Sequence, residues 1–195
     1  MRHFLVILLF LTFVSGCRHS ADKPDPNDSV LYSTHSAKIR GLDPGDIGDT
    51  TSSLIASQIF ECLYQYHYLK RPYQLIPCLA EQMPVMSQDG LVWTIKIKKG
   101  VRFADDKCFK NGKGREVTAN DFIFAWKRIA NIKYLSKNWW IFDNKIIGLD
   151  EFREYTKTCK KADDVDYNMP VEGLQAPDDH TLVIKLKKPW PQMVY

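Results

Sequence analysis

Apolar and polar residues alternate in two segments of the chain, 91–98 and 181–187. A period of two places successive side chains on opposite faces of a strand, so both segments are predicted to be strands with one buried and one solvated face. The short run 101–103 follows a Lys-Gly turn and is expected to continue the sheet. In the first segment, the buried face is predicted to carry Leu91, Trp93, Ile95 and Ile97.

A helical period occurs in two other segments. Residues Asp49–Ser52 supply candidate N-caps, and the apolar residues behind them recur at intervals of three and four: Ile55, Ile59, Leu63 and Tyr66. Thr118 and Asp121 have the spacing of a capping box, and apolar residues at helical spacing follow them as far as Ile129. Two amphipathic helices are therefore predicted. Helices and strands mix without a regular βαβ repeat.

The first seventeen residues have the layout of a secretory signal peptide: a short basic start, the apolar run Phe4–Val14, and small residues before Cys17. The run is shorter than the about 20 residues that span a bilayer, so cleavage is expected. The sequence Val-Ser-Gly-Cys resembles a bacterial lipobox, whose cysteine is diacylated and becomes the first mature residue. We therefore expect lipidation at Cys17; an ordinary signal peptide with an incidental cysteine is the alternative.

This interpretation divides the chain into three parts. Residues 1–16 are the expected signal peptide, and 17–29 the lipidated N-terminus with a flexible tether, because this stretch has two prolines and no apolar periodicity. Residues 30–195 are the expected folded part, starting with a strand at 30–32. The protein is then exported and held at the bacterial cell membrane, facing the periplasm or the cell exterior. Which membrane holds the anchor stays open.

Composition excludes several other classes. The formal net charge of +4 comes from 27 basic and 23 acidic residues spread along the chain, so no basic stripe points to nucleic acid. Neither the cysteines nor the histidines have metal-ligand spacing, and we expect no metal site and no cofactor. Export permits disulfides, but no pairing is selected among four cysteines, and a buried free thiol on a helix is the alternative for the first: Cys62, Cys78, Cys108 and Cys159.

The chain also lacks GxSxG, SxxK and HExxH, the short motifs of common hydrolases. We therefore predict that it is not an enzyme. A lipid-anchored hydrolase would need a catalytic geometry that no local motif reveals.

Five short motifs resemble, in order, those of the bacterial extracellular solute-binding proteins that serve oligopeptide, dipeptide and nickel importers. Each motif alone is only a turn with an amphipathic element, but five in order are specific. One departure is the link after Phe103, which continues here in a longer basic loop to Arg115. The motifs are Gly41–Pro44, Ile59–Leu63, Leu75–Glu81, Asp89–Thr94 with Ile97–Phe103, and Thr118–Phe122 with Lys127–Ile129.

The resemblance implies an α/β, periplasmic-binding-protein-like fold of the large two-lobed type. Relatives are markedly longer, so residues 30–195 are expected to form only the N-terminal portion of lobe I, as a fragment or a truncated product. The implied function is that of a substrate-binding lipoprotein of an ABC importer, which captures oligopeptides or similar small solutes and delivers them to permease subunits. Nickel, haem or sugar are other possible ligands. A solute-sensing or degenerate lipoprotein without a transport role is the alternative.

In peptide-binding relatives, the segment between the first strand and the G-L-D-P motif approaches the ligand. By position, small polar residues that offer donors and acceptors fill this segment here. A solvated loop is the alternative interpretation. For the neighbouring tryptophans at 139 and 140, packing in the core is expected rather than stacking on a ligand. The expected ligand-binding residues are Ser33, Thr34, His35 and Ser36.

Overall fold

The computed structural model describes Ser29, Thr34 and residues 37–194. The chain divides into two units, 1–36 and 37–195, and the described helices and strands all belong to the second. The strand expected at 30–32 lies outside the described residues. Within the part of the chain that is described, no helix has the length and apolar character needed to cross a membrane.

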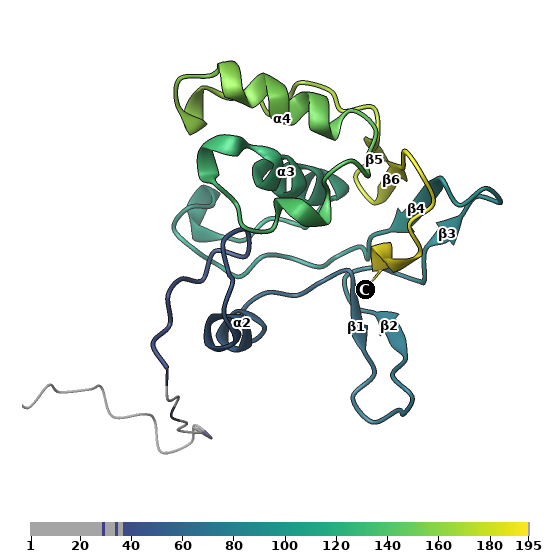
Figure 1. Ribbon diagram of the computed structural model, residues 1–195. Coiled ribbons are helices and arrows are strands. Elements are labelled where there is room, and N and C mark those ends of the chain that lie inside the picture. Colours follow the sequence, from purple (N-terminus) through teal and green to yellow (C-terminus); the bar gives the residue numbers. More distant parts are fainter. Residues whose placement is uncertain (1–28, 30–33, 35–36, 195) are drawn as a thin grey trace, which may run out of the picture. The chain divides into compact units, whose positions relative to one another are not determined.

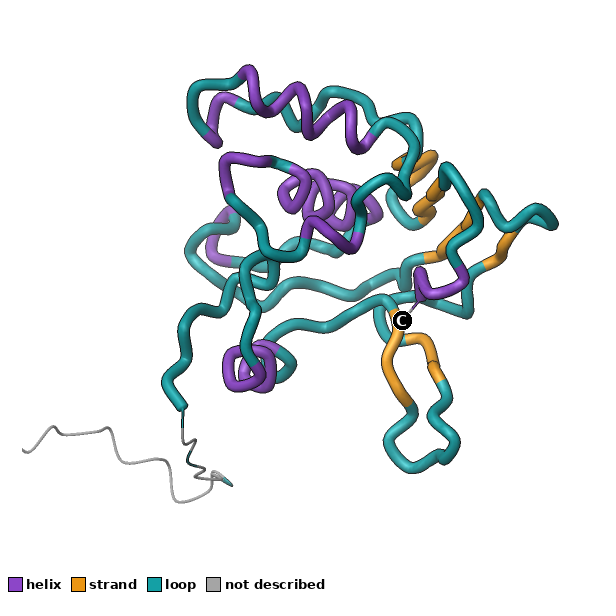
Figure 2. The backbone as a smooth tube through the Cα atoms, viewed as in Figure 1, coloured by secondary structure: helices purple, strands orange, loops and turns teal. Residues whose placement is uncertain are grey.

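Helices and strands alternate irregularly along residues 37–194, as an α/β chain with long connecting loops (Figures 1 and 2). Short 3-10 turns fill several connections, at Lys110–Gly112, Ile132–Tyr134, Trp139–Ile141, Ala162–Asp164 and Pro191–Val194. The main elements are α2 (Thr50–Ala56), β1 (Tyr64–Tyr66), β2 (Leu75–Pro77), β3 (Val85–Met86), β4 (Val92–Lys96), α3 (Ala119–Ala130), α4 (Leu149–Thr158), β5 (Leu174–Asp178) and β6 (Thr181–Lys185).

Four strands form an antiparallel sheet in the order β3-β4-β6-β5. In the central pair, Trp93 lies opposite Ile184 and Ile95 opposite Leu182. All four side chains are buried on one face, as the period of two predicts. The strands expected at 91–98 and 181–187 are confirmed. Residues 101–103 do not continue this sheet, because Arg102 instead forms an isolated bridge with Glu116.

Helix α3 packs against β5 and β6 on one side and against α4 on the other (Figure 1). It begins with the expected capping box: the Asp121 carboxylate accepts a hydrogen bond from the Thr118 backbone N–H at 2.8 Å. The second predicted helix is thereby confirmed. The most deeply buried apolar side chains of the core come from the sheet, from α4 and from the segment before α4: Ile95, Ile97, Ile146, Leu149, Phe152, Leu182, Ile184 and Leu186.

The first predicted helix is correct only in its beginning. Asp49 caps α2 by accepting a hydrogen bond from Ser52 N–H at 2.9 Å, but the helix ends at Ala56. Tyr64 and Tyr66 lie in strand β1, so the expected helix over this whole stretch is wrong. Alternating aromatic and polar residues favour a strand there. Cys62 consequently lies exposed in the loop before β1, not on a helix.

Candidate functional site

Most of the residues expected to bind ligand or lipid lie outside the described residues: Cys17, Ser33, His35 and Ser36. Thr34 is described, and it is exposed and belongs to no helix or strand. These expectations stay predictions. What the structure does describe is the segment that follows them in sequence, residues 37–49, which we name the G-L-D-P loop.

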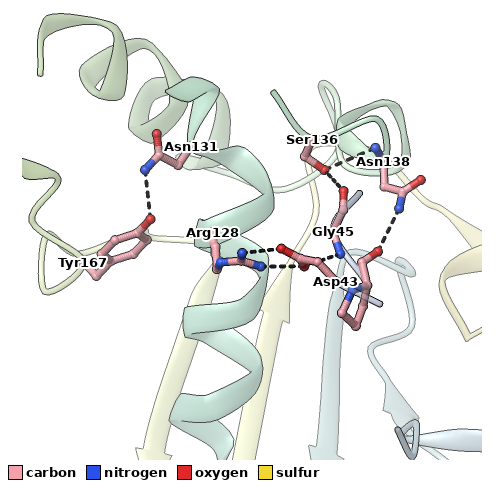
Figure 3. Close-up of polar contacts among 8 residues, drawn as sticks. Asp43, Gly45, Arg128, Asn131, Ser136, Asn138 and Tyr167 are labelled. Atoms are coloured by element: carbon pink, nitrogen blue, oxygen red, sulfur yellow. Dashed lines mark hydrogen bonds and ion pairs between the residues drawn. The ribbon is translucent and has the colours of Figure 1, made fainter. Parts of the chain in front are cut away.

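An arginine of α3 holds the middle of the G-L-D-P loop. The Arg128 guanidinium donates hydrogen bonds to both carboxylate oxygens of Asp43, from Nη1 to Oδ1 at 2.8 Å and from Nη2 to Oδ2 (Figure 3). The same guanidinium lies 4.7 Å from the centre of the Tyr134 ring. A bidentate contact of this kind fixes both the position and the orientation of the carboxylate.

Polar side chains after α3 bind the backbone of the same loop. The Ser136 hydroxyl donates to the Gly45 carbonyl, and the Asn138 amide donates to the Pro44 carbonyl at 3.0 Å (Figure 3). Lys137 forms an ion pair of 3.0 Å with Asp46. The turn of the loop therefore has its backbone carbonyls occupied by partners that lie far along the sequence.

Backbone N–H groups at the start and in the turn of the G-L-D-P loop also have side-chain partners. The Arg40 N–H donates to the hydroxyl of Ser52, which is fully buried in α2, at 3.0 Å. Inside the turn, Gly45 N–H donates to the Asp43 Oδ1 atom at 3.0 Å. The loop is thus fixed at both its start and its turn by contacts within the chain.

The charges in this network reinforce it. The hydrogen bond from Arg128 lowers the pKa of Asp43, against the opposing effect of partial burial, and the Gly45 N–H lowers it further. The carboxylate correspondingly raises the pKa of Arg128. Both groups are therefore charged across the neutral pH range, and the ion pair persists there.

Two small hollows lie beside the loop. One, of about 230 Å³, is lined by charged residues that include Arg40, Asp49 and Lys137. The other, of about 160 Å³, is lined by residues that include Arg128 and Tyr134. Pockets that enclose small molecules usually measure about 300–1,000 Å³. Both hollows are smaller than that, and a larger, mainly apolar groove of about 500 Å³ lies elsewhere, between the segment after α2 and α3.

The structure also addresses the other candidate residues. Among residues 37–194, no group of three or more His, Cys, Asp or Glu lies close enough to hold a metal ion. Trp139 packs against the core, with the Arg153 guanidinium 4.6 Å from its ring centre. Trp140 is 70% exposed, so the expectation that it packs in the core is wrong. The four cysteines of the described region, Cys62, Cys78, Cys108 and Cys159, are all free thiols.

Sequence comparison finds a match between residues 74–195 and the family model described as "Bacterial extracellular solute-binding proteins, family 5 Middle". The periplasmic oligopeptide-binding protein OppA of Escherichia coli K12 is 28% identical and aligns with 83% of this chain and 26% of its own length. The periplasmic murein peptide-binding protein MppA of the same organism is 27% identical, over 100% of this chain and 33% of its own.

A solved structure is similar as well. The substrate-binding domain of an oligopeptide ABC transporter from Bacillus anthracis superposes with a TM-score of 0.62 at 27% identity, over 83% of this chain and 27% of the other. The chain thus spans about a quarter to a third of the length of these proteins. The likeness confirms the expected fold class, an α/β portion of one lobe of a periplasmic peptide-binding protein.

Proposed function

The chain belongs to the bacterial extracellular solute-binding proteins of family 5, and from that premise we propose that it carries part of the solute site of an ABC importer's substrate-binding lipoprotein. The ligand is an oligopeptide or a similar small solute. The observation that carries the proposal is the family match over residues 74–195, supported by relatives whose names state oligopeptide and murein peptide binding. The family consists of solute-binding proteins, and the proposed role involves no chemical step.

The proposed contact with the ligand is made by Ser33, Thr34, His35 and Ser36. Hydroxyl and imidazole groups can pair with a peptide main chain, and a main-chain contact tolerates many ligand sequences. The adjoining G-L-D-P loop supports this proposal because its turn is already held by Arg128, Ser136 and Asn138. A segment that leads out of a fixed loop loses less conformational freedom when a ligand binds.

The proposed location is the outer side of a bacterial membrane, with a diacylated Cys17 as the anchor. The support is the signal-peptide layout followed by Val-Ser-Gly-Cys. Mass spectrometry of the protein extracted from membranes is expected to show a chain that starts at Cys17 and carries acyl mass. The variant Cys17→Ser is expected to leave the membrane fraction, and its retention there would contradict the anchor.

Calorimetric titration of the natural protein with a pool of short peptides tests the ligand. Saturable binding is expected, and Thr34→Val is expected to weaken it roughly fivefold, because one hydrogen bond contributes about 1 kcal/mol. Thr158→Val removes the same hydroxyl from an exposed position on α4 and is the matched control. Absence of peptide binding together with tight binding of haem, a sugar or a metal ion would overturn the peptide assignment.

A further inference from the structure

Strands β1 and β2 form a two-stranded ribbon that joins no other strand of the described chain (Figure 1). The ribbon is packed at two points: Tyr64, at its base, is buried in the core cluster, and Leu75, which pairs with Tyr66, packs against that cluster. From there the ribbon extends away from the four-stranded sheet and the helices and ends in a long turn. We name residues 66–74 the hairpin tip.

The hairpin tip exposes an unusual amount of apolar surface. Tyr68 is 88% exposed, Leu69 78% and Tyr73 69%. A single exposed apolar residue is ordinary, but several in one turn make a patch that marks an interaction surface. The tip projects from the rest of the described chain (Figure 1), which suits contact with a broad surface better than enclosure of a small solute.

The charge of the ribbon has one sign. No Asp or Glu occurs between residues 62 and 80, whereas Lys70 and Arg71 lie together and exposed at the tip. Neither Lys70 nor Arg71 forms an ion pair with a carboxylate among residues 37–194. Two cations are thus available to an anionic partner.

The tip is also ordered by its own contacts. The Nδ1 atom of His67 accepts hydrogen bonds from the N–H groups of Leu69 at 3.2 Å and Lys70 at 3.3 Å. The Arg71 guanidinium lies 4.4 Å from the centre of the Tyr73 ring and donates to the Lys70 carbonyl at 2.8 Å. The turn itself therefore presents the aromatic, aliphatic and basic side chains together.

We propose that the hairpin tip contacts the surface of an anionic membrane. Tyrosine is enriched at the level of lipid headgroups, where its ring is apolar and its hydroxyl is wet, and lysine and arginine are attracted to anionic headgroups. The inference rests on the proposed anchor at Cys17. Residues 17–36 reach at most about 70 Å when fully extended, so an anchored chain keeps the folded part near the bilayer.

The test uses the full acylated chain on vesicles. Trypsin cleaves after Lys70, whereas the following Arg71-Pro72 bond resists it, so one cut reports access to the tip. On vesicles with about 30% phosphatidylglycerol, cleavage is expected to be roughly tenfold slower than on pure phosphatidylcholine, since each basic side chain contributes roughly fivefold to binding. Salt at about 0.5 M is expected to abolish the difference by screening.

Two leucines with the same exposure supply a matched pair. Leu69 in the tip and Leu135 after α3 are each 78% exposed. Leu69→Ser is expected to lose most of the protection on anionic vesicles, and Leu135→Ser is expected to keep it. Equal loss in both variants would contradict a specific role for the tip.

The outcomes separate the contact from the anchor. Retention of the chain on pure phosphatidylcholine vesicles reports the acyl anchor. The difference in cleavage rate between the two vesicle types reports contact by the hairpin tip. Equal cleavage on both types, with the chain retained on both, would overturn the membrane contact and leave the anchor intact. Protection found only in native membranes, and never on protein-free vesicles, would also overturn it, in favour of a protein partner.

Discussion

The G-L-D-P loop and the hairpin tip are both irregular segments, but they are held in opposite ways. In the loop, Asp43 and Gly45 are bound by side chains 85 and 91 residues further along the chain. In the tip, the side-chain contacts of His67 and Arg71 reach no further than three residues. The loop is therefore part of the tertiary structure, whereas the tip has only the structure that its own turn provides.

The G-L-D-P loop and the hairpin tip therefore represent two ways in which a protein surface can be arranged for a partner. Long-range polar contacts fix the loop to α3, so that any segment continuing from it starts from a defined position. The tip instead exposes apolar rings and cations, and it is joined to the core through the ribbon, where Tyr64 and Leu75 pack. Substitutions should therefore affect the two segments independently.

The largest effect is expected from Asn131→Ala, at the end of α3. Asn131 is fully buried, and its side-chain Nδ2 donates to the Tyr167 hydroxyl at 2.9 Å (Figure 3). Its side-chain Oδ1 accepts from Lys133 N–H at 3.0 Å. The loss leaves the half-buried Tyr167 hydroxyl and Lys133 N–H without this partner and opens a cavity at a fully buried position, so it is expected to lower the free energy of unfolding by about 2–3 kcal/mol. Denaturation in urea measures it. Asn168→Ala, at an exposed position, is the control and should change stability by less than about 0.5 kcal/mol.

Hydrogen exchange in the same Asn131→Ala variant tests the comparison directly. The Gly45 amide, in the G-L-D-P loop, is expected to exchange faster because the segment that carries Ser136 is no longer held. The His67 amide, which donates to the Gln74 carbonyl at 2.7 Å in the ribbon, is expected to exchange at an unchanged rate. Equal acceleration at both amides would show that the two segments are coupled and would contradict the distinction.

A smaller effect is expected from Asp43→Asn, which removes the charge but keeps the shape of the side chain. The partly exposed ion pair with Arg128 is worth about 1 kcal/mol at neutral pH. Because the pKa of Asp43 is lowered in the folded protein, this contribution is present above the unfolded value of about 3.9 and is lost as the pH falls through the folded value.

Urea denaturation at neutral pH and near pH 3 measures the effect of Asp43→Asn. The difference between the variant and the natural chain should shrink in acid, and a difference that grew there would contradict the assignment. Glu154→Gln breaks the exposed pair with Lys157 on α4 and is the control, since such pairs contribute little.

The sequence predicts those parts of the fold in which apolar residues recur at a clear period. Strands β4 and β6 and helix α3 bury one face each, and their apolar residues repeat at the period of the element. Helix α4 carries few large apolar residues on its buried face, mainly Leu149 and Phe152, and also buries Thr156 there, so no such period stands out. The helix expected as far as Tyr66 fails because apolar spacing alone does not show where the backbone changes to a strand.

The candidate site was less predictable, for a different reason. Nothing near Arg128 in sequence indicates that its partner is Asp43, 85 residues earlier. Ser136 and Asn138 are ordinary loop residues until the fold brings Gly45 and Pro44 beside them. Local patterns record which face of an element is buried, but the polar contacts between distant loops exist only in the folded chain.

The smallest expected effect on the free energy of unfolding, and the only stabilising one, concerns Tyr64 at the base of the ribbon. The buried hydroxyl of Tyr64 has no hydrogen-bond partner among the described residues, and burial raises its pKa to about 12. Tyr64→Phe removes this unsatisfied group and keeps the ring, so the free energy of unfolding should rise by about 0.5 kcal/mol. Tyr155→Phe is the matched control and should lower it, because the Tyr155 hydroxyl accepts a hydrogen bond from Asp166 N–H at 3.1 Å.

The pH dependence gives the Tyr64→Phe prediction a second and independent measurement. A folded pKa of about 12, above the unfolded value of about 10, makes the natural chain lose stability as the pH rises from the lower value to the higher one. Tyr64→Phe should remove that part of the alkaline loss, whereas a variant in the hairpin tip such as Leu69→Ser should leave it unchanged. If Tyr64→Phe lowered stability at neutral pH and kept the full alkaline loss, the hydroxyl would have a partner, and the ribbon would be tied to the core by more than apolar packing.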